Sequence, residues 1–337
     1  MSKKILVTGG AGYIGSHTVV ELMLAGYEPI IIDDFRNSKP WIIDRIAELA
    51  GRYPLGHSVD CADEKEVLAV FKNYPDILGV IHFAAYKAVG ESVQHPTRYY
   101  QNNVGSLCAV LNAMKECGVA HLVFSSSCTV YGEPGVAEVT EQTPIQKATS
   151  PYGDTKITCE KIIQFVKDSG QPIKAALLRY FNPIGAHPSA RLGELPNGVP
   201  NNLVPYITQT AAGIRKELTV FGNDYSTPDG TNIRDYIHVV DLATAHVQAI
   251  DWLLKQETNT CEAFNLGTGK GTSVLEIIHN FEAVNGLKLN YKIGPRRAGD
   301  VEQIFANPAK AEKALGWGCK YSVADALRHS WDWEKTL

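Results

Sequence analysis

Two groups of residues in this sequence have types and spacings suited to chemistry. Tyr152 and Lys156 form a Tyr-x-x-x-Lys pair, and residues 8–15 form a glycine-rich turn, TGGAGYIG. Residues four apart lie on one face of a helix, so we expect the ammonium to lie near the phenol and to lower its pKa by stabilising the phenolate. Such a phenol can take a proton from a sugar hydroxyl near neutral pH. With a dinucleotide at the glycine turn, the pair predicts redox chemistry at a secondary alcohol.

Ser127 is the third residue of the predicted catalytic group. It ends a run of three serines, 125–127, that follows a strand-like run ending at Phe124. Side chains at the carboxyl end of a strand face the cleft of a doubly wound sheet, so Ser127 is expected to hydrogen-bond the sugar oxygen that Tyr152 deprotonates. Tyr-x-x-x-Lys pairs are also common on surface helices, and three serines alone fit a loop equally well. The glycine turn upstream favours catalysis, with Lys156 also reaching the nicotinamide ribose.

The elements around the glycine turn follow the order of a dinucleotide-binding unit. Residues 4–8 form a strand-like run, and apolar residues then recur at helical spacing until Gly26, which is expected to end the helix. The N-terminus of that helix would offer free N–H groups to phosphates. A second strand ends at Asp33, 18 residues after Gly15, about where a ribose-binding carboxylate is expected. This acid favours NAD over NADP, although Arg36 could accept a 2′-phosphate. The alternative is an ordinary tight turn with a surface aspartate.

Composition indicates an ordinary globular chain. Its 337 residues are 45% hydrophobic and 20% charged, with a formal net charge of −4, and no basic stripe supports nucleic-acid binding. No apolar run approaches the roughly 18 residues of a membrane span, and the stretch before the glycines is too short for a signal peptide. The seven cysteines match no zinc or disulfide spacing, so we expect reduced thiols, no metal and a cytoplasmic location.

Strand and helix signals alternate through the first half of the chain and predict an α/β fold, with a doubly wound parallel sheet (Rossmann) covered on both faces. Proline and glycine then cluster in a predicted loop, and the short elements beyond it suit a smaller C-terminal α/β lobe that closes over a substrate. We predict a dinucleotide-binding domain over 1–184 and a mainly substrate-binding lobe over 185–337, with the chain crossing back to the first domain. The strand-like runs are 80–83, 122–124 and 175–180, and the loop is 193–200.

Glycines at 9, 12 and 15 give a spacing that resembles the short-chain dehydrogenase/reductase superfamily, and their place at the chain start resembles its extended branch. Seven further segments, in order along essentially the whole chain, resemble the UDP-glucose 4-epimerase family: 82–87 (HFAAYK), 99–103 (YYQNN), 125–132 (SSSCTVYG), 179–187 (RYFNPIGAH), 200–203 (PNNL), 234–241 (RDYIHVVD) and 297–300 (RAGD). The resemblance implies reversible C4 epimerisation of UDP-galactose and UDP-glucose in galactose metabolism. Tyr152 takes the 4-hydroxyl proton, bound NAD takes and returns the hydride, and the 4-keto sugar turns over in between.

The same resemblance implies the binding residues. The cofactor set is Gly9, Gly12, Tyr13, Ile14, Asp33, Asn37, Ser38, Asp60, Cys61, Phe83, Ala84, Lys87, Asn102, Lys156 and Tyr180. The hexose set is Lys87, Ser127, Tyr152, Tyr180, Asn182 and Asn202, and the nucleotide is anchored by Leu203, Phe221, Arg234, Arg297 and Asp300. Arginine suits the diphosphate because its donors fork onto two oxygens, and Asp60 would accept from the adenine amino group. The alternatives are a surface ion-pair network for the two arginines and Asp300, and a solvated side chain for Lys87.

Three positions depart from the family. Tyr86 and Cys128 replace the usual leucine and alanine, and neither change removes a donor that the chemistry needs. Ile304 falls where some members carry tyrosine. Because isoleucine is smaller, we hypothesise that an N-acetyl group at sugar C2 fits, so that UDP-N-acetylhexosamines are also accepted.

Two other functions are compatible with the fold. A nucleotide-sugar 4,6-dehydratase of the same fold needs an Asp-Glu acid and base where this chain has Cys128 and Thr129, so it is disfavoured. A non-catalytic NAD-binding sensor would typically lose Tyr152 or Lys156, and this chain keeps both.

The resemblance also implies a homodimer, because related enzymes pair two helices from each subunit into a four-helix bundle. The corresponding stretches here are 104–117 and 155–166. Burial of their apolar faces within one subunit is the alternative. The apolar residues concerned are Leu107, Val110, Leu111, Met114, Ile162, Ile163 and Val166.

Overall fold

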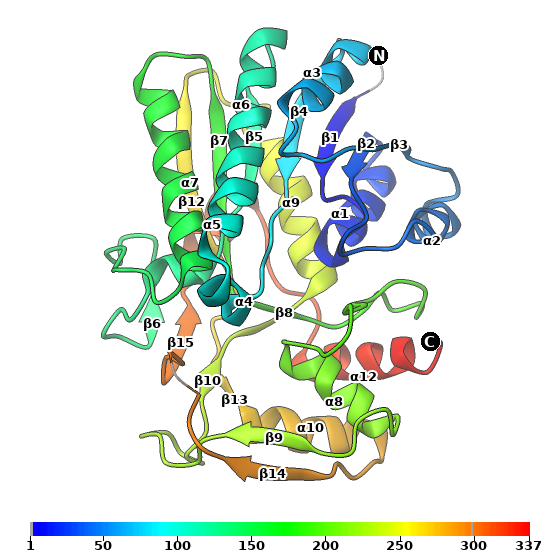
Figure 1. The fold of residues 1–337 in the computed structure, drawn as a ribbon, viewed down its shortest axis with the longest axis vertical. Coiled ribbons are helices and arrows are strands. Elements are labelled where there is room, and N and C mark those ends of the chain that lie inside the picture. Colours follow the sequence, from blue (N-terminus) through cyan, green and yellow to red (C-terminus); the bar gives the residue numbers. More distant parts are fainter. Residues whose placement is uncertain (1–2, 298) are drawn as a thin grey trace.

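The computed structural model describes residues 3–297 and 299–337. A seven-stranded sheet with helices on both faces forms the upper part in Figure 1, and shorter strands and helices form a smaller lobe below it. Every strand pair within the large sheet is parallel. The predicted doubly wound α/β fold with a smaller C-terminal lobe is therefore confirmed.

The large sheet has the strand order β12-β7-β5-β4-β1-β2-β3. The chain direction across the sheet reverses between β1 and β4, and ligands of such sheets bind in the crevice at the carboxyl ends of the strands on either side of this switch. β12 comes from the second half of the chain and pairs with β7, while the boundary at 184/185 stays a prediction. The strands are β1 Lys4–Thr8, β2 Glu28–Asp33, β3 Leu55–Ser58, β4 Ile77–His82, β5 His121–Ser125, β7 Lys174–Tyr180 and β12 Thr260–Leu266.

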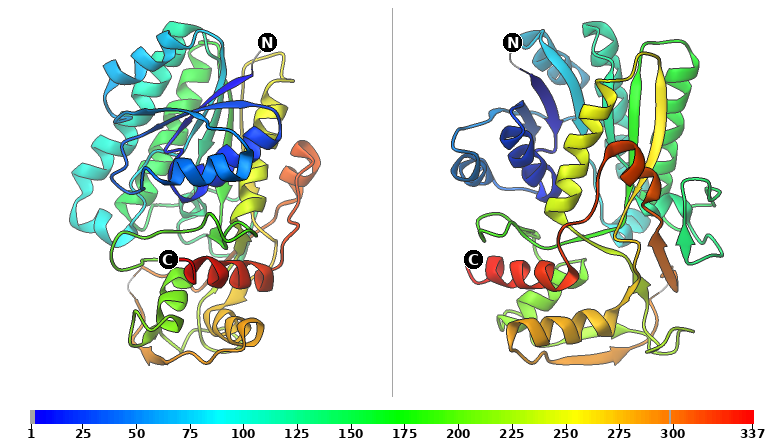
Figure 2. Two further views of the ribbon diagram at one scale, coloured as in Figure 1. Left: turned by 90° about the vertical axis from the view of Figure 1, so that its right-hand side faces the viewer. Right: turned by 180° about the vertical axis from the view of Figure 1, so that it is seen from behind.

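Alternating side chains of the strands enter two separate apolar cores, one on each face of the sheet. Ile5 and Val7 of β1 pack into the core beneath α1 and α9, whereas Leu6 packs into the core beneath α3, α6 and α7. This alternation follows from the two-residue period of a strand, and burial on both faces is typical of parallel sheets. Figure 2 shows α9 crossing the back of the sheet. The helices of the large part are α1 Tyr13–Leu24, α2 Ile42–Ala50, α3 Glu64–Asn73, α6 Gly105–Cys117, α7 Pro151–Asp168 and α9 Val239–Leu253.

The small lobe has its own core, in which Ile207, Phe281 and Leu327 join three helices. It contains a two-stranded sheet of β9 and β14, and β10 and β15 pair beside β13 and β6. Its elements are α8 Leu203–Ala211, β9 Leu218–Phe221, β10 Ile233–Arg234, β13 Thr272–Ser273, α10 Val274–Asn285, β14 Tyr291–Gly294, β15 Gln303–Ala306 and α12 Val323–Glu334.

Short elements complete the described chain. They are α4 Val89–Gln94, α5 Pro96–Tyr99, a π-helical turn Tyr100–Val104, a 3₁₀ turn Cys128–Tyr131, β6 Glu138–Val139, β8 Asn182–Ile184, β11 Tyr236–His238 and α11 Ala309–Leu315. No helix among the described residues is long and apolar enough to cross a membrane.

The apolar faces of α6 and α7 point mainly into the molecule. Leu107, Val110, Leu111, Met114 and Ile163 are buried in the core between these helices and the sheet, and Ile162 and Val166 pack against it. The alternative of burial within one subunit therefore accounts for these residues, and they give no support to a homodimer.

Candidate active site

The glycine turn joins β1 to α1 at the switch point of the large sheet. Gly9 has a φ of +67°, and a Cβ on Gly15 would lie 2.2 Å from the carbonyl oxygen of Gly9. Only glycine therefore allows the turn to fold so tightly. Gly12 caps α1 with no side-chain hydrogen bond, so the first N–H groups of the helix stay available to an anion. This donor set fits a dinucleotide pyrophosphate.

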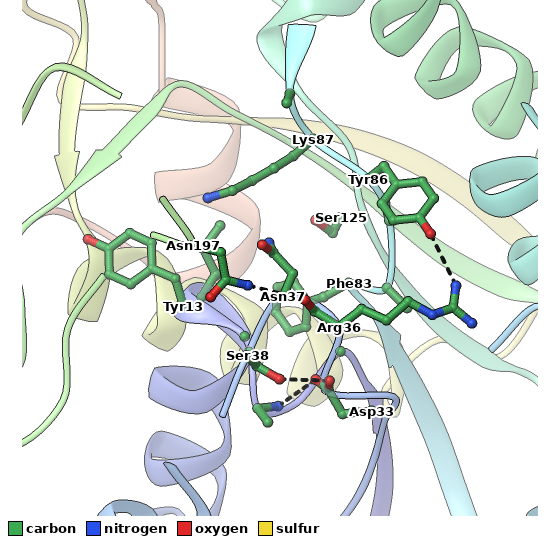
Figure 3. Close-up of a pocket in the computed structure, with 18 of the residues that line it drawn as sticks. Tyr13, Asp33, Arg36, Asn37, Ser38, Phe83, Tyr86, Lys87, Ser125 and Asn197 are labelled. Carbon is green, nitrogen blue, oxygen red and sulfur yellow. Dashed lines mark hydrogen bonds between the residues drawn. The ribbon is translucent and has the colours of Figure 1, made fainter. Parts of the chain in front are cut away.

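Asp33 lies at the end of β2 and is held in place by three donors. Its carboxylate accepts hydrogen bonds from the backbone N–H of Ala11 at 3.0 Å, from that of Phe35 at 2.9 Å and from the Ser38 hydroxyl at 2.9 Å. Burial raises its pKa, and the hydrogen bonds act against that rise. With only 7% of its surface exposed, Asp33 is buried, so the alternative of a surface aspartate is wrong. Figure 3 shows Asp33 and Ser38 together on the cleft wall.

Arg36 is engaged by neighbouring carboxylates. Its guanidinium pairs with Asp34 at 3.1 Å, pairs closely with Asp60 and donates to the Tyr86 hydroxyl at 3.1 Å. These acids neutralise the cation, which weakens the case for a 2′-phosphate site. The contact also occupies one oxygen of Asp60, the residue expected to meet adenine. No pattern in the sequence indicated that pairing.

Tyr152 and Lys156 lie in the first two turns of α7, against the end of β5. Ser150 caps the helix by accepting from the backbone N–H of Gly153, and Pro151 follows at the first helical position. The Lys156 ammonium donates to the carbonyl oxygen of Ser125 at 2.7 Å and lies 6.0 Å from the centre of the Tyr152 ring. Only 8% of the surface of Tyr152 and 4% of that of Lys156 is exposed.

The predicted lowering of the pKa of Tyr152 is wrong in this structure. Burial raises its pKa well above the ordinary value, the neighbouring Tyr180 adds to the rise, and a hydrogen bond with the Ser127 hydroxyl acts against it. Burial also lowers the pKa of Lys156 to about 8, because the charged ammonium loses water in the interior. The Lys156 ammonium donates a hydrogen bond to the Ser125 carbonyl as well as lying near the phenol. Helical spacing alone therefore overstates how far it lowers the pKa of Tyr152.

A buried ionic network holds the segment of residues 125–127 against α7. Arg179 donates to both oxygens of Glu160, at 3.0 and 2.7 Å, and to the Tyr131 hydroxyl at 3.2 Å. Glu160 also accepts from the Ser126 hydroxyl at 2.5 Å. Since Glu160 lies one turn after Lys156 on α7, the network ties the catalytic helix to the segment that carries Ser125 and Ser127. Nothing in the sequence marked Glu160 for this role.

One cleft of about 580 Å³ gathers most of the predicted residues. All of the predicted cofactor residues line it, together with Tyr152 and Asn202. The cleft is also lined by residues that were not predicted, including Arg36, Tyr86, Ser125, Glu194 and Asn197. Ser127, Asn182, Leu203, Phe221, Arg234, Arg297 and Asp300 are not among its lining residues.

In the small lobe, Arg297 contacts two of the other predicted nucleotide anchors. Arg297 pairs with Asp300 at 2.6 Å, and its guanidinium lies 5.9 Å from the centre of the Phe221 ring. Arg234 instead donates to the backbone oxygens of Ile233 and Glu302. Ile304 pairs with Arg234 across β10 and β15 and is buried in a small apolar core beside Cys128 and Phe181.

The chain resembles known proteins over nearly its full length. Residues 6–330 match the family model described as GDP-mannose 4,6 dehydratase. A UDP-glucose 4-epimerase from Bacillus subtilis is 48% identical over 332 residues, which cover 98% of this chain and 97% of that protein. A UDP-glucose 4-epimerase structure from Bifidobacterium longum with NAD⁺ and UDP superposes with a TM-score of 0.95 at 45% identity, covering 99% of this chain and 98% of that one. Another, from Stenotrophomonas maltophila with NAD and formylated UDP-arabinopyranose, has a TM-score of 0.96 at 44% identity, with the same coverage.

The doubly wound sheet, the glycine turn and the Tyr152–Lys156 pair define an enzyme of the extended short-chain dehydrogenase/reductase class. At this identity and coverage, the chain belongs to the UDP-glucose 4-epimerase family.

Proposed function

We propose that this protein interconverts UDP-galactose and UDP-glucose by inverting C4 of the hexose, using a bound NAD, in galactose metabolism. The observation that carries the proposal is the position of Tyr152 and Lys156 on the wall of the same cleft as the glycine turn and Asp33. Relatives of this chain with NAD and uridine nucleotides bound have the same fold. The glycine turn and Asp33 would hold NAD, which when bound would supply a hydride acceptor at C4 and, in its oxidised form, a positive charge that favours the phenolate.

The chain's own residues divide the remaining work. Tyr152 takes the proton from the 4-hydroxyl and returns it to the keto oxygen, with Ser127 hydrogen-bonded to the phenol and steadying it. Lys156, held by the Ser125 carbonyl, keeps an ammonium beside the ribose and phenol. The glycine turn offers backbone N–H groups to the pyrophosphate, and Asp33 accepts from the adenosine ribose. Exclusion of water by the buried site protects the keto sugar.

On the substrate side, Arg234, Arg297 and Asp300 would hold the diphosphate and ribose, while Lys87, Asn182 and Asn202 meet the hexose. A firm hold on the nucleotide and a loose hold on the sugar let the keto sugar turn over without leaving. Acceptance of UDP-N-acetylhexosamines remains a hypothesis that rests on Ile304. It fails if UDP-N-acetylgalactosamine is not turned over where UDP-galactose is.

We infer a cytoplasmic homodimer on family grounds. The free thiols of the described chain fit a reducing compartment, and light scattering coupled to gel filtration measures the subunit number directly.

The two other functions have less support. Cys128 stands where a dehydratase needs a carboxylate, and burial raises the pKa of its thiol to about 11, so it is a poor acid or base near neutral pH. A sensor without catalysis does not need a buried phenol and ammonium at a serine-lined cleft.

Proton NMR of UDP-galactose with the purified protein, without added cofactor, tests the proposal. Appearance of UDP-glucose up to a fixed ratio supports it and indicates a retained NAD. If nothing changes, NAD is added. If the spectrum still does not change, or if Tyr152→Phe behaves like the wild type, the epimerase proposal is wrong and the sensor gains.

A further inference from the structure

Residues 193–202 form a strap along the cleft, and its N-terminal part is fixed from two sides. The indole N–H of Trp333, on α12, donates to the carbonyl oxygen of Glu194 at 2.9 Å. A Cβ on Gly193 would lie 2.5 Å from the Trp333 ring, so the backbone lies directly against the indole. Further along, the Asn197 amide donates to the carbonyl oxygen of Arg36 at 3.1 Å, and Figure 3 shows these two residues close together beside the cleft.

The side chain of Glu194 joins two predicted ligand-binding residues from different parts of the molecule. One carboxylate oxygen accepts from the Lys87 ammonium at 3.2 Å and from the Asn202 amide at 2.7 Å. Lys87 follows β4 of the large sheet, and Asn202 is the N-cap residue of α8 in the small lobe. The side chain of Glu194 is only 12% exposed, whereas that of Lys87 is 50% exposed.

We propose that Glu194 is a positioning residue for the hexose, which aligns the Lys87 ammonium from the large sheet and the Asn202 amide from the small lobe. This inference rests on the proposed function, because it is the UDP-hexose that the two donors would meet. An exposed lysine has many rotamers, and a buried acceptor at 3.2 Å restricts them before substrate arrives. The hydrogen bond to Asn202 also fixes which end of the amide is the donor.

The geometry distinguishes this role from simple support of the strap. The backbone supports the strap where the Trp333 indole meets the carbonyl of Glu194, and the carboxylate adds one contact within the strap, to Asn202. The carboxylate also pairs with Lys87, which lies outside the strap, and both Lys87 and Asn202 line the cleft. Truncating it should therefore change substrate binding more than it changes the stability of the strap.

The test compares Glu194→Ala with Glu194→Gln, which keeps an oxygen acceptor. We expect Glu194→Ala to raise KM for UDP-galactose about tenfold, the loss expected for a hydrogen bond to a charged group, with kcat and retained NAD near the wild-type values. In Glu194→Gln, the rise in log KM should be at most half of the rise seen in Glu194→Ala. Glu217→Ala is the matched control, since Glu217 pairs with Lys292 at 2.6 Å outside the cleft, and it should leave KM unchanged.

Three results overturn the inference: an unchanged KM in Glu194→Ala, equal losses in the alanine and glutamine variants, or a melting temperature that falls in parallel with activity. In a double-mutant cycle, adding Lys87→Met to Glu194→Ala should cost less than Lys87→Met alone, because the two side chains act together. If the wild type binds UDP-galactose but does not epimerise it, the proposed function fails. The calorimetric Kd of the wild type and Glu194→Ala then still decides the positioning role, since a Kd that is the same in both overturns it.

Discussion

The carboxylate of Asp33 is fixed by hydrogen bonds from the backbone and side chains of the large part. In the small lobe, by contrast, the side chains of Arg297 and Phe221 are largely exposed. The carboxylate of Asp33 accepts three hydrogen bonds at 2.9 to 3.0 Å. The side chain of Arg297 is 59% exposed and pairs with Asp300, and Phe221 is 43% exposed.

The contrast shows how two parts of one molecule can serve two ligands with different needs. A cofactor that stays bound is best met by rigid groups, because little entropy is lost on binding to a preformed site. A substrate that must enter, turn over and leave is better served by groups that rearrange. We therefore expect changes in the cofactor half to be severe and all-or-none, and changes in the nucleotide-sugar half to be graded and confined to KM.

The largest effect is expected from Gly15→Ala. The added Cβ would lie 2.2 Å from the carbonyl oxygen of Gly9 and 3.0 Å from the Cα of Gly10, so the turn must open and the pyrophosphate site is lost. We expect no retained NAD in acid-released extracts and no epimerisation. Gly105→Ala is the control, because its Cβ meets nothing within 4 Å and lies at the start of α6. A Gly15→Ala protein that retains NAD would contradict the view that the tight glycine turn is needed to bind the pyrophosphate.

Tyr152→Phe should lower kcat by about 10²- to 10⁴-fold, the usual contribution of a positioned acid–base group. The cofactor half should be unaffected, so NAD content should equal that of the wild type. Tyr100→Phe is the matched control, since the Tyr100 hydroxyl pairs with Asp154 away from the lining of the cleft. Rate measurements by coupled assay decide the matter, and a fall in NAD content alongside kcat would show that the tyrosine acts through cofactor binding instead.

Lys156→Met tests whether the buried ammonium of the cofactor half lowers the free energy of unfolding. Burial lowers the pKa of Lys156 to about 8 from its ordinary value of 10.5, so the ammonium destabilises the folded state at all pH values below about 8. As pH rises from about 8 to 10.5, the unfolded state alone binds this proton and the penalty disappears. NAD-free Lys156→Met should therefore be more stable than the wild type at pH 7, by an amount on the order of 3 kcal/mol, and the gap should close by pH 10.5.

Denaturant melts of the two NAD-free proteins at several pH values measure that gap. A constant gap between pH 7 and 10.5 would mean that packing of the methionine, and not loss of the buried charge, explains the change. Epimerase activity of Lys156→Met should fall at every pH.

The smallest effect is expected from Arg297→Ala. Loss of a partly exposed charge-assisted hydrogen bond to a phosphate should raise KM for UDP-galactose roughly tenfold, with kcat and NAD content unchanged. Arg296→Ala is a close control, because Arg296 pairs with Asp224 and lies 4.0 Å from the centre of the Tyr225 ring. A fall in kcat equal to the rise in KM would remove the contrast between the two halves.

Many strands and helices around the large sheet were predicted from the sequence, because each pattern that indicates them spans only a few neighbouring residues. The run 4–8 forms β1 as predicted, and Gly26, with a φ of +84°, follows the last residues of α1. The predicted strands 122–124 and 175–180 lie within β5 and β7. Hydrophobic period and glycine geometry are local properties, so they can be read without knowing the rest of the chain.

Long-range contacts account for what the sequence did not predict. The Arg36 pairing with Asp60, the Glu160–Arg179 network and the contact of Glu194 with Lys87 each join residues distant in sequence. The helical spacing of apolar residues in α6 and α7 was predicted correctly. That spacing does not distinguish a contact between subunits from burial in the chain's own core, because both need apolar residues at the same positions.

The sequence alone determined the glycine turn, the acid at Asp33 and the tyrosine and lysine one turn apart, since these depend on local backbone geometry. The tertiary structure decided the electrostatic state of that pair. Burial at the end of β5 raises the pKa of Tyr152 and lowers that of Lys156, and burial depends on which distant segments pack around a side chain.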